Sequence, residues 1–302
     1  MSQIYTVYLA PEGREADLEK ELGHHVIERH DRLFLCNAPV HPVYFWQDIW
    51  YEARKIPITS IKDGAKKLRG IQRNWAIYPH SHHRRAALIE ENLPHMSLKP
   101  LLFRTLPPQS PLGGWCLLDK DLILAAPETA TPVANGAYEF EENKTVPPNR
   151  AYLKLWEAFT RLGRFPQKGE RALDLGACPG GWSWVLHECG CDVIAVDKAP
   201  LDKKMARLPR VEFKKESAFG LSPSDIGPVD WLCSDIICYP DRLYSLVTEW
   251  IDSGLVKNMV CTLKLQGETD FAAIEPFAAI PNSQIIHLYQ NKHELTWFWS
   301  KA

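Results

Sequence analysis

Residues 171–188 read RALDLGACPGGWSWVLHE, and this stretch decides how the second half of the chain folds. An apolar run containing Asp174 predicts a buried β-strand, and a glycine-rich turn leads from it into a helical pattern. Glycines at Gly176, Gly180 and Gly181 let the backbone approach a ligand closely and adopt dihedral angles that other residues avoid. The stretch therefore predicts the first strand, turn and helix of an α/β fold that binds a nucleotide.

Strands and helices alternate from this stretch onward, which is typical of a mostly parallel sheet. A short QNKH link joins the last two strands, and because a parallel return needs a long crossover, those strands must pair antiparallel. The sequence thus predicts a seven-stranded Rossmann-like sheet with an antiparallel last strand. The expected strands are 171–175, 192–196, 211–214, 230–234, 259–263, 284–288 and 294–299, and the expected helices are 151–162, 182–188, 241–253 and 268–279.

The first half of the chain is less regular and predicts a small α+β module, of one or two subdomains. Strand-like pieces are expected at 4–9, 33–36 and 75–78, helical pieces at 14–22, 62–69 and 84–91, and a hairpin in WCLLDKDLILAA. Residues 127–149 are rich in Pro, Thr, Asn and Glu and favour a connecting segment. We place the N-terminal module at 1–147 and the C-terminal domain at 148–302.

The composition is that of a globular protein: 302 residues, 45% hydrophobic, 24% charged, with a formal net charge of −2. Any nucleic-acid site must then be a local basic patch and not the whole surface. The start of the chain meets acidic residues at once and resembles no signal peptide, and no apolar run approaches the ~20 residues of a membrane helix. We expect a cytoplasmic protein whose eight cysteines are reduced.

The glycine turn discriminates between nucleotide classes. A P-loop needs Lys followed by Ser or Thr after its last glycine, whereas Trp182 and Ser183 follow here, and the glycine spacing does not match the dinucleotide fingerprint. S-adenosylmethionine remains, because its methionine end carries no pyrophosphate. Asp197 ends the second strand, where a carboxylate can accept hydrogen bonds from both ribose hydroxyls. A tight turn without a ligand is the alternative interpretation.

Four polar residues interrupt apolar segments: Lys154, Asp235, Lys264 and Glu294. The last three should meet at one sheet edge, where two parallel strands end and the antiparallel strand begins, and Lys154 joins them if its helix packs across that edge. A lysine whose pKa is depressed by burial and a second amine can deprotonate a ribose hydroxyl. We assign Lys264 as the base, Lys154 to orient the hydroxyl and keep Lys264 deprotonated, and the two carboxylates to position the amines.

Each of these residues also has a structural interpretation. Lys154 could be a solvated helix side chain, Asp235 a helix cap, and Glu294 a strand-edge charge. Together they favour function over structure.

The motifs DLGACPGGW, AYLKLWEAF, LCSDI, CTLKL and HELTW resemble the FtsJ-type ribose 2′-O-methyltransferases over residues 149–302, most closely the RlmM type that modifies a cytidine of bacterial large-subunit ribosomal RNA. The resemblance implies the same Lys-Asp-Lys-Glu tetrad and, more weakly, a THUMP-like RNA-binding module in the first half. Ser217, after Glu216, stands where the family has an acid for the adenine amine, and Ala151 stands where RlmM-type sequences tend to have a serine. The expected S-adenosylmethionine-binding residues are Gly176, Cys178, Pro179, Gly180, Gly181, Trp182, Asp197, Ser217 and Asp235.

Residues 62–85 combine basic and aromatic side chains, a pattern suited to RNA phosphates and unpaired bases. Trp75 and Tyr78 are the expected stacking rings, although a solvated charged face would show the same pattern. Neither the closely spaced His80, His82 and His83 nor the lone Cys189–Cys191 pair predicts a metal site. The expected RNA-contacting residues are Lys66, Lys67, Arg69, Arg73, Arg84 and Arg85.

The favoured function is transfer of a methyl group from S-adenosylmethionine to a ribose 2′-hydroxyl of RNA, on a sheet of the class I methyltransferase type that the resemblance implies. Methylation of a base amine typically shows an Asn/Asp-Pro-Pro-Tyr/Phe stretch where this chain has SDIICYP, and Cys238 lacks the proline context of a carbon-methylating nucleophile. A non-catalytic RNA- or ribosome-binding protein on a methyltransferase scaffold is the alternative. A small-molecule methyltransferase with the N-terminal module as a lid is a third interpretation, which the tetrad disfavours.

Overall fold

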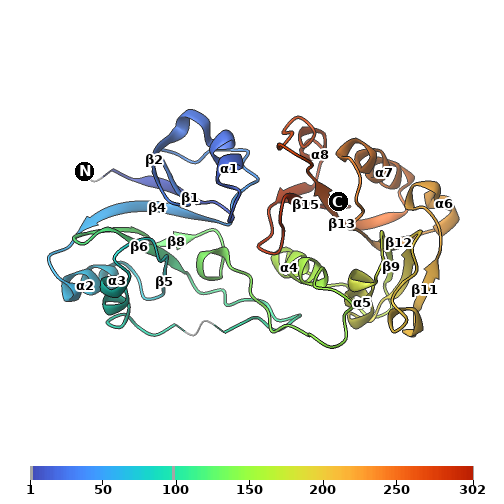
Figure 1. Ribbon diagram of the computed structural model, residues 1–302, viewed down its shortest axis with the longest axis horizontal. Coiled ribbons are helices and arrows are strands. Elements are labelled where there is room, and N and C mark those ends of the chain that lie inside the picture. Colours follow the sequence, from blue (N-terminus) through green and yellow to red (C-terminus); the bar gives the residue numbers. More distant parts are fainter. Residues whose placement is uncertain (1–2, 97–98, 302) are drawn as a thin grey trace. The chain divides into compact units, whose positions relative to one another are not determined.

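The computed structural model describes residues 3–96 and 99–301, and it divides the chain into two compact units (Figure 1). The N-terminal unit runs to Leu101 and includes Pro107–Glu139. The C-terminal unit comprises Leu102–Leu106 and the chain from Phe140 onward.

The C-terminal unit is built on a seven-stranded sheet with the order β11-β10-β9-β12-β13-β15-β14. Strands β9 to β13 pair in parallel, whereas β15 is antiparallel to both β13 and β14. The predicted mixed sheet with an antiparallel last strand is confirmed. The strands are β9 (Arg171–Leu175), β10 (Asp192–Val196), β11 (Val211–Lys214), β12 (Val229–Ser234), β13 (Val256–Lys264), β14 (Ser283–Ile286) and β15 (Glu294–Ser300).

Helices cover both faces of this sheet, with α4 and α5 on one side and α7 and α8 on the other (Figure 1). Local signals set their ends: α7 begins at Pro240, whose fixed φ suits a first helical position, and it stops at Gly254, where φ is 70°. The helices are α4 (Tyr152–Leu162), α5 (Gly181–Glu188), α6 (Pro223–Ile226), α7 (Pro240–Ser253) and α8 (Glu275–Ala278).

The predicted helix over 268–279 is wrong, because only α8 forms there. Asp270 Oδ1 accepts from the backbone N–H groups of Ala272 and Ala273, at 3.0 and 3.4 Å, which stabilises a turn. Pro276 then lacks the N–H that a continuous helix would need and lies instead in the first turn of α8.

A short segment from the first half of the chain completes the C-terminal unit. The ring of Phe103 stacks on that of Trp156 in α4, with centroids 4.6 Å apart and planes 9° from parallel. Trp156 is only 4% exposed, so this segment covers part of the hydrophobic core. Nothing in the sequence pattern around Phe103 predicted that contact.

The N-terminal unit is an α+β structure around an eight-stranded sheet, with the order β2-β3-β1-β4-β7-β6-β5 and β8 paired to β4. Helices α2 and α3 pack on the β5–β7 end through Leu68, Ile89 and Trp115, among others. The strands are β1 (Tyr5–Leu9), β2 (Val26–His30), β3 (Leu33–Cys36), β4 (Asp48–Pro57), β5 (Trp75–Ile77), β6 (Gly113–Asp119), β7 (Leu122–Ala126) and β8 (Glu128–Thr129), and the helices are α1 (Glu15–Leu22), α2 (Ile61–Ile71) and α3 (His83–Glu90).

None of the helices among residues 3–96 and 99–301 has both the length and the hydropathy needed to cross a bilayer.

Candidate active site

The turn after β9 needs its glycines for two separate reasons. Gly176 and Gly180 have φ values of 78° and 117°, which side chains rarely adopt. A Cβ on Gly176 would also lie 2.7 Å from Cγ1 of Ile236, and real Cβ atoms do not approach so closely. The turn after β9 therefore packs directly against the segment that follows β12.

The start of α4 is fixed against the start of α5. The indole N–H of Trp182 donates to the carbonyl of Ala151 at 2.9 Å, and the side-chain oxygen of Asn149 occupies the space where Gly181 would carry a Cβ. Trp182 is buried, at 4% exposure. These contacts hold the first turn of α4, which carries Lys154, beside the glycine turn.

The structure brings Lys154, Asp235, Lys264 and Glu294 together in one closed ion cluster. Lys154 Nζ lies 3.3 Å from Asp235 Oδ2 and 2.6 Å from Glu294 Oε1. Lys264 Nζ lies 2.6 Å from Asp235 Oδ1 and 2.7 Å from Glu294 Oε2. Each carboxylate thus bridges both amines. The side chains are 9–17% exposed, so the cluster is shielded from bulk water but still reachable.

Register explains why three of the four meet. Lys264 and Glu294 are directly paired residues of the antiparallel strands β13 and β15. Asp235 follows Ser234, which ends β12 in parallel register with Cys261. Paired positions on neighbouring strands lie about 5 Å apart, which is within reach of long polar side chains.

The pKa of Lys264 shifts in the opposite direction to the one expected from the sequence. Burial lowers the pKa of the Lys264 amine, but Asp235 and Glu294 together outweigh burial and raise it above the ordinary lysine value. For Glu294, burial raises the pKa, and the two lysines outweigh that and lower it. The prediction that Lys154 and burial depress the pKa of Lys264 is therefore wrong for the protein alone, because two hydrogen-bonded carboxylates stabilise the ammonium.

A cavity of about 360 Å³ opens beside the cluster, and Asp235 belongs to both. Of the residues predicted to bind S-adenosylmethionine, Gly176, Cys178, Asp197, Ser217 and Asp235 line it. Pro179, Gly180, Gly181 and Trp182 belong to the turn and the start of α5 and are not among its lining residues. The lining residues that the sequence did not single out as contacts are Val196, Lys198, Glu216, Ala218, Phe219, Ile236, Ile237 and Arg242.

Carboxylates surround one side of this cavity. Asp197 at the tip of β10 accepts from the backbone N–H of Cys178 at 3.0 Å and from that of Ala199 at 2.9 Å. Asp174 lies buried one strand away, and it accepts from the Ser183 hydroxyl at 2.6 Å. Burial raises the pKa of Asp174 to about 7, and the charges of Asp235 and Asp197 add to that rise. Asp197, Glu216 and Asp235 line the cavity together with Lys198 and Arg242, so the cavity offers partners for both signs of charge.

Glu157 in α4 was not predicted, and it connects this helix to the link between β14 and β15. It is fully buried, and its two carboxylate oxygens accept from the backbone N–H groups of Tyr289 and Gln290 at 2.8 and 2.9 Å. Arg161 pairs with it at 2.8 Å. Lys154 precedes Glu157 by one helical turn and Glu294 ends the link, so Glu157 fixes the two sides of the ion cluster relative to each other. A glutamate inside the apolar stripe of AYLKLWEAF was the available signal.

Most of the predicted RNA-contacting residues lie at the surface of α2 and α3, but several already have partners. Lys67 donates to the carbonyl of Pro57 at 2.7 Å and pairs with Asp63, Arg69 donates to the carbonyl of Asn92, and Arg85 lies 3.6 Å from Asp121. Lys66, Arg73 and Arg84 are exposed.

The prediction that Trp75 and Tyr78 stack on bases is wrong. The two rings are 4% and 7% exposed, and their polar atoms donate inward, to Leu68 and Gln72 carbonyls and to Asp31. Both aromatic rings of this segment therefore belong to the hydrophobic core.

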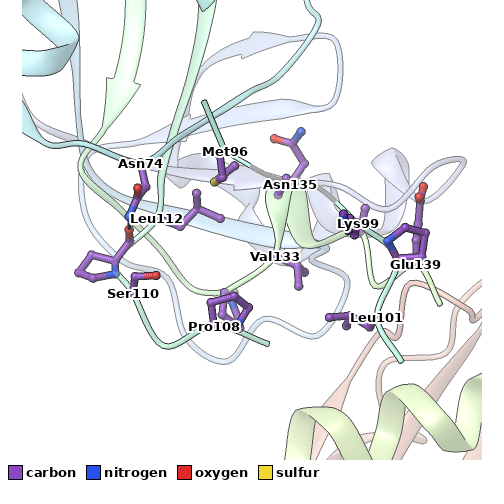
Figure 2. Close-up of a pocket in the computed structure, with 15 residues that line it drawn as sticks. Asn74, Met96, Lys99, Leu101, Pro108, Ser110, Leu112, Val133, Asn135 and Glu139 are labelled. Atoms are coloured by element: carbon purple, nitrogen blue, oxygen red, sulfur yellow. Dashed lines mark hydrogen bonds between the residues drawn. The ribbon is translucent and has the colours of Figure 1, made fainter. Parts of the chain in front are cut away.

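A second cavity, of about 350 Å³, lies in the N-terminal unit (Figure 2). Its walls are largely apolar, with Leu112, Val133 and several prolines, and the amide of Asn135 is tied to the carbonyl of Ile77 at 2.9 Å. None of the predicted RNA-contacting residues lines it.

Comparison with known proteins shows which family the C-terminal part of the chain resembles. Residues 147–266 match the family model of FtsJ-like methyltransferases. The resemblance expected from the sequence is thereby confirmed. The match includes the glycine turn, Lys154, Asp235 and Lys264, whereas Glu294 lies beyond it.

Curated relatives carry the name Ribosomal RNA large subunit methyltransferase M. The relative from Halorhodospira halophila is 40% identical over 121 residues, 39% of this chain and 35% of that protein. The relative from a strain of Xanthomonas oryzae is 27% identical over 286 residues, 89% of this chain and 76% of that protein. In four such relatives the chain spans only 35–45% of their length.

Among solved structures, magnesium protoporphyrin IX methyltransferase from Synechocystis, with bound S-adenosylmethionine, is 13% identical with a TM-score of 0.37. The similarity covers 50% of this chain and 79% of that one.

Proposed function

We propose that this chain transfers a methyl group from S-adenosylmethionine to a ribose 2′-hydroxyl of RNA, and that its target is a cytidine of large-subunit ribosomal RNA. One observation carries the proposal. Asp235 is at once a member of the Lys-Asp-Lys-Glu cluster and a wall of the cavity beside the glycine turn. A methyl donor in that cavity would lie next to the two amines and two carboxylates of the cluster.

The donor groups of the cavity suit S-adenosylmethionine. A volume of about 360 Å³ lies in the range of small-molecule sites. Each oxygen of Asp197 accepts one backbone hydrogen bond and retains capacity for one more, which suits the two ribose hydroxyls. The lining carboxylates of Asp197, Glu216 and Asp235 provide partners for a cationic ligand, and Phe219 and Ile236 provide apolar contact for a base.

When bound, the cofactor supplies an electrophilic methyl group on a sulfonium. Lys264 accepts the proton of the 2′-hydroxyl as the oxygen forms its bond to that methyl group, and the electrons of the broken bond stay on sulfur. Lys154 donates a hydrogen bond that orients the hydroxyl, while Asp235 and Glu294 hold both amines in place. Because the carboxylates raise the pKa of Lys264 in the protein alone, Lys264 must lose a proton before it can act. The pKa of Lys264 would be lowered by the positive sulfonium of a cofactor bound in the cavity, since like charges destabilise the ammonium form.

Binding of the RNA is proposed for the N-terminal module, residues 1–147, as a THUMP-like unit. Lys66, Arg73 and Arg84 are exposed and provide the positive charge that phosphates require. A cytoplasmic setting follows from the proposed ribosomal RNA substrate.

Replacement of Lys264 tests the proposal directly. Lys264→Ala should reduce methyl transfer to RNA by about 10²–10⁴-fold, the range that general-base catalysis typically contributes. Its affinity for S-adenosylmethionine, measured by titration calorimetry, should stay nearly unchanged. Turnover would be followed as tritium transferred from labelled cofactor to deproteinised large-subunit ribosomal RNA.

Lys257→Ala is the matched control. Lys257 lies in the same strand, β13, and also forms a 2.6 Å ion pair, with Asp230, but its side chain is 68% exposed. The control should keep wild-type turnover. A Lys264→Ala protein with wild-type turnover would remove Lys264 from its proposed role, and a wild-type protein that binds the cofactor and RNA without methylation would favour the non-catalytic alternative.

A further inference from the structure

Two large hydrophobic side chains in the segment after Asp235 are mostly exposed to solvent. Ile237 and Tyr239 are 83% and 68% exposed, the highest values for large hydrophobic residues in the described part of the chain. Single exposed hydrophobic residues are common on protein surfaces. Two within three positions, adjacent to a site, indicate a contact with something outside the chain.

Their position relative to the site follows from the segment that carries them. Residues 235–240 connect the end of β12 to the start of α7. Asp235 belongs to the ion cluster, and Ile237 lines the cavity that Asp235 also lines. Tyr239 comes four residues after Asp235, so their Cα atoms lie within roughly 14 Å of each other. Ile237 therefore lies at the cavity itself, and Tyr239 is exposed two residues further along the same segment.

The backbone under the tyrosine ring is rigid. The carbonyl of Tyr239 accepts from the N–H groups of Arg242 and Leu243, at 3.1 and 3.3 Å, as the first acceptor of α7. Pro240 follows directly and restricts the approach of the chain. An exposed ring on such a support costs little conformational entropy when a partner covers it.

Positive charges line the cavity that Ile237 lines. Lys198 and Arg242 line the same cavity and are exposed, and the guanidinium of Arg242 lies 3.8 Å from the ring centre of Phe219. An aromatic ring and an aliphatic side chain flanked by cations suit an unpaired nucleotide, whose base stacks and whose phosphates are anionic. A purely apolar peptide would make no use of the cations.

We propose that Tyr239 and Ile237 form a platform on which the base of the target nucleotide stacks while its ribose lies at the Lys-Asp-Lys-Glu cluster. This inference rests on the proposed methyl transfer to RNA. It makes Tyr239 a residue that positions the substrate, and it leaves proton transfer with Lys264.

Steady-state kinetics on large-subunit ribosomal RNA, prepared from cells that lack the gene, test the platform. Tyr239→Ala should raise KM for the RNA about tenfold, because base–aromatic stacking typically has that strength or more, while kcat changes by less than about threefold. Tyr239→Phe should restore the wild-type KM, since stacking needs the ring and not the hydroxyl. Ile237→Ala should raise KM by a smaller factor.

Leu106→Ala serves as the control, because Leu106 belongs to the same unit and is 46% exposed but does not line the cavity. It should leave KM unchanged. If wild-type protein methylates the RNA and Tyr239→Ala keeps the wild-type KM, the platform is refuted and the proposed function stands. If Tyr239→Phe is as impaired as Tyr239→Ala, the hydroxyl acts and stacking is refuted. If wild-type protein transfers no methyl group to RNA, the proposed function fails and the platform fails with it.

Discussion

Lys264 lies between two carboxylates that stabilise its protonated form, and this defines the chemistry of the site. Burial alone would lower the pKa of the Lys264 amine, but Asp235 and Glu294 outweigh burial and raise it. The lysine is therefore a latent base, whose activity depends on the balance of charge around it. Removing one carboxylate should change that balance in a known direction.

Glu294→Gln should lower the pKa of Lys264, because it removes a negative charge 2.7 Å from the amine. If Lys264 must be neutral to act, kcat rises with pH as the amine loses its proton, and in the variant this rise should move to lower pH. The pH dependence of the remaining kcat measures the shift. Glu275→Gln, which alters an exposed carboxylate of α8, should leave the profile in place. A rise at unchanged or higher pH in Glu294→Gln would contradict the proposed base.

Asp174 offers a second test at the residue scale, on stability. Its pKa is about 7 in the folded protein against an ordinary value of 3.8, because burial disfavours the charge. A raised carboxyl pKa stabilises the fold below the ordinary value, and that contribution is lost as pH rises toward 7, by about 1.4 kcal/mol per pH unit.

Asp174→Asn keeps an acceptor for Ser183 and removes the titration. The free energy of unfolding of the variant, relative to the wild type, should therefore increase by about 1.4 kcal/mol per pH unit between pH 5 and pH 7. Denaturant unfolding at both pH values gives this difference. A difference that does not vary with pH would show that Asp174 is not the buried, proton-bearing group described here.

At the scale of elements, the strands of the C-terminal sheet were predictable, whereas some contacts between distant segments, such as that of Phe103 with Trp156, were not. Regular alternation and a short final link were enough to specify seven strands and their order of appearance. The predicted helix over 268–279 was wrong because hydrophobic spacing alone reveals neither the turn that Asp270 stabilises nor the effect of Pro276 within the run. In the N-terminal unit, β4 was missed because its DIWYEARKIP sequence mixes charges into a strand that is only partly buried.

The site shows the same division. Lys154, Asp235, Lys264 and Glu294 could be picked out because charge at the end of an apolar segment is costly without a use. Trp75 and Tyr78 were misassigned because a sequence cannot tell an aromatic ring in the core from one on the surface. Glu157 was missed although it interrupts the apolar stripe of α4, because its backbone N–H partners at Tyr289 and Gln290 leave no trace in the sequence.

Glu157→Gln should loosen the link between β14 and β15. The amide can satisfy one of the two backbone donors, at Tyr289 and Gln290, but its NH₂ group opposes the other, which typically costs about 1–3 kcal/mol. Hydrogen–deuterium exchange at these two amides should become faster, and kcat should fall while cofactor affinity stays the same. Glu188→Gln, at a surface position in α5, is the control. Unchanged exchange at both amides would rule out this positioning role.

At the scale of the whole molecule, the two compact units do not follow a single cut in the sequence. Leu102–Leu106 belongs with the C-terminal unit, so a fragment that starts at residue 140 lacks part of its own core. Phe103→Ala in the full chain should lower the free energy of unfolding of the C-terminal unit by about 1 kcal/mol or more, because the ring stacks on Trp156. Thermal unfolding followed by tryptophan fluorescence measures this loss. An unchanged melting temperature would place the segment outside the unit.

A fragment experiment tests whether the C-terminal unit binds the cofactor while the N-terminal module binds RNA, separately from the stability that residues 102–106 contribute. A fragment of residues 140–302, mixed with a peptide of residues 102–106 where stability requires it, should bind S-adenosylmethionine and fail to bind ribosomal RNA. Calorimetry and filter binding give the two affinities. RNA binding by this fragment at wild-type affinity would refute the role proposed for the N-terminal module.

The most direct measurement is nucleoside mass spectrometry of large-subunit ribosomal RNA from cells that lack the gene, complemented with either the wild-type chain or Lys264→Ala. The account predicts one cytidine methylated on its ribose 2′-oxygen with the wild-type chain and unmodified with Lys264→Ala. The same methylation in both strains, or a methyl group on a base, would contradict it.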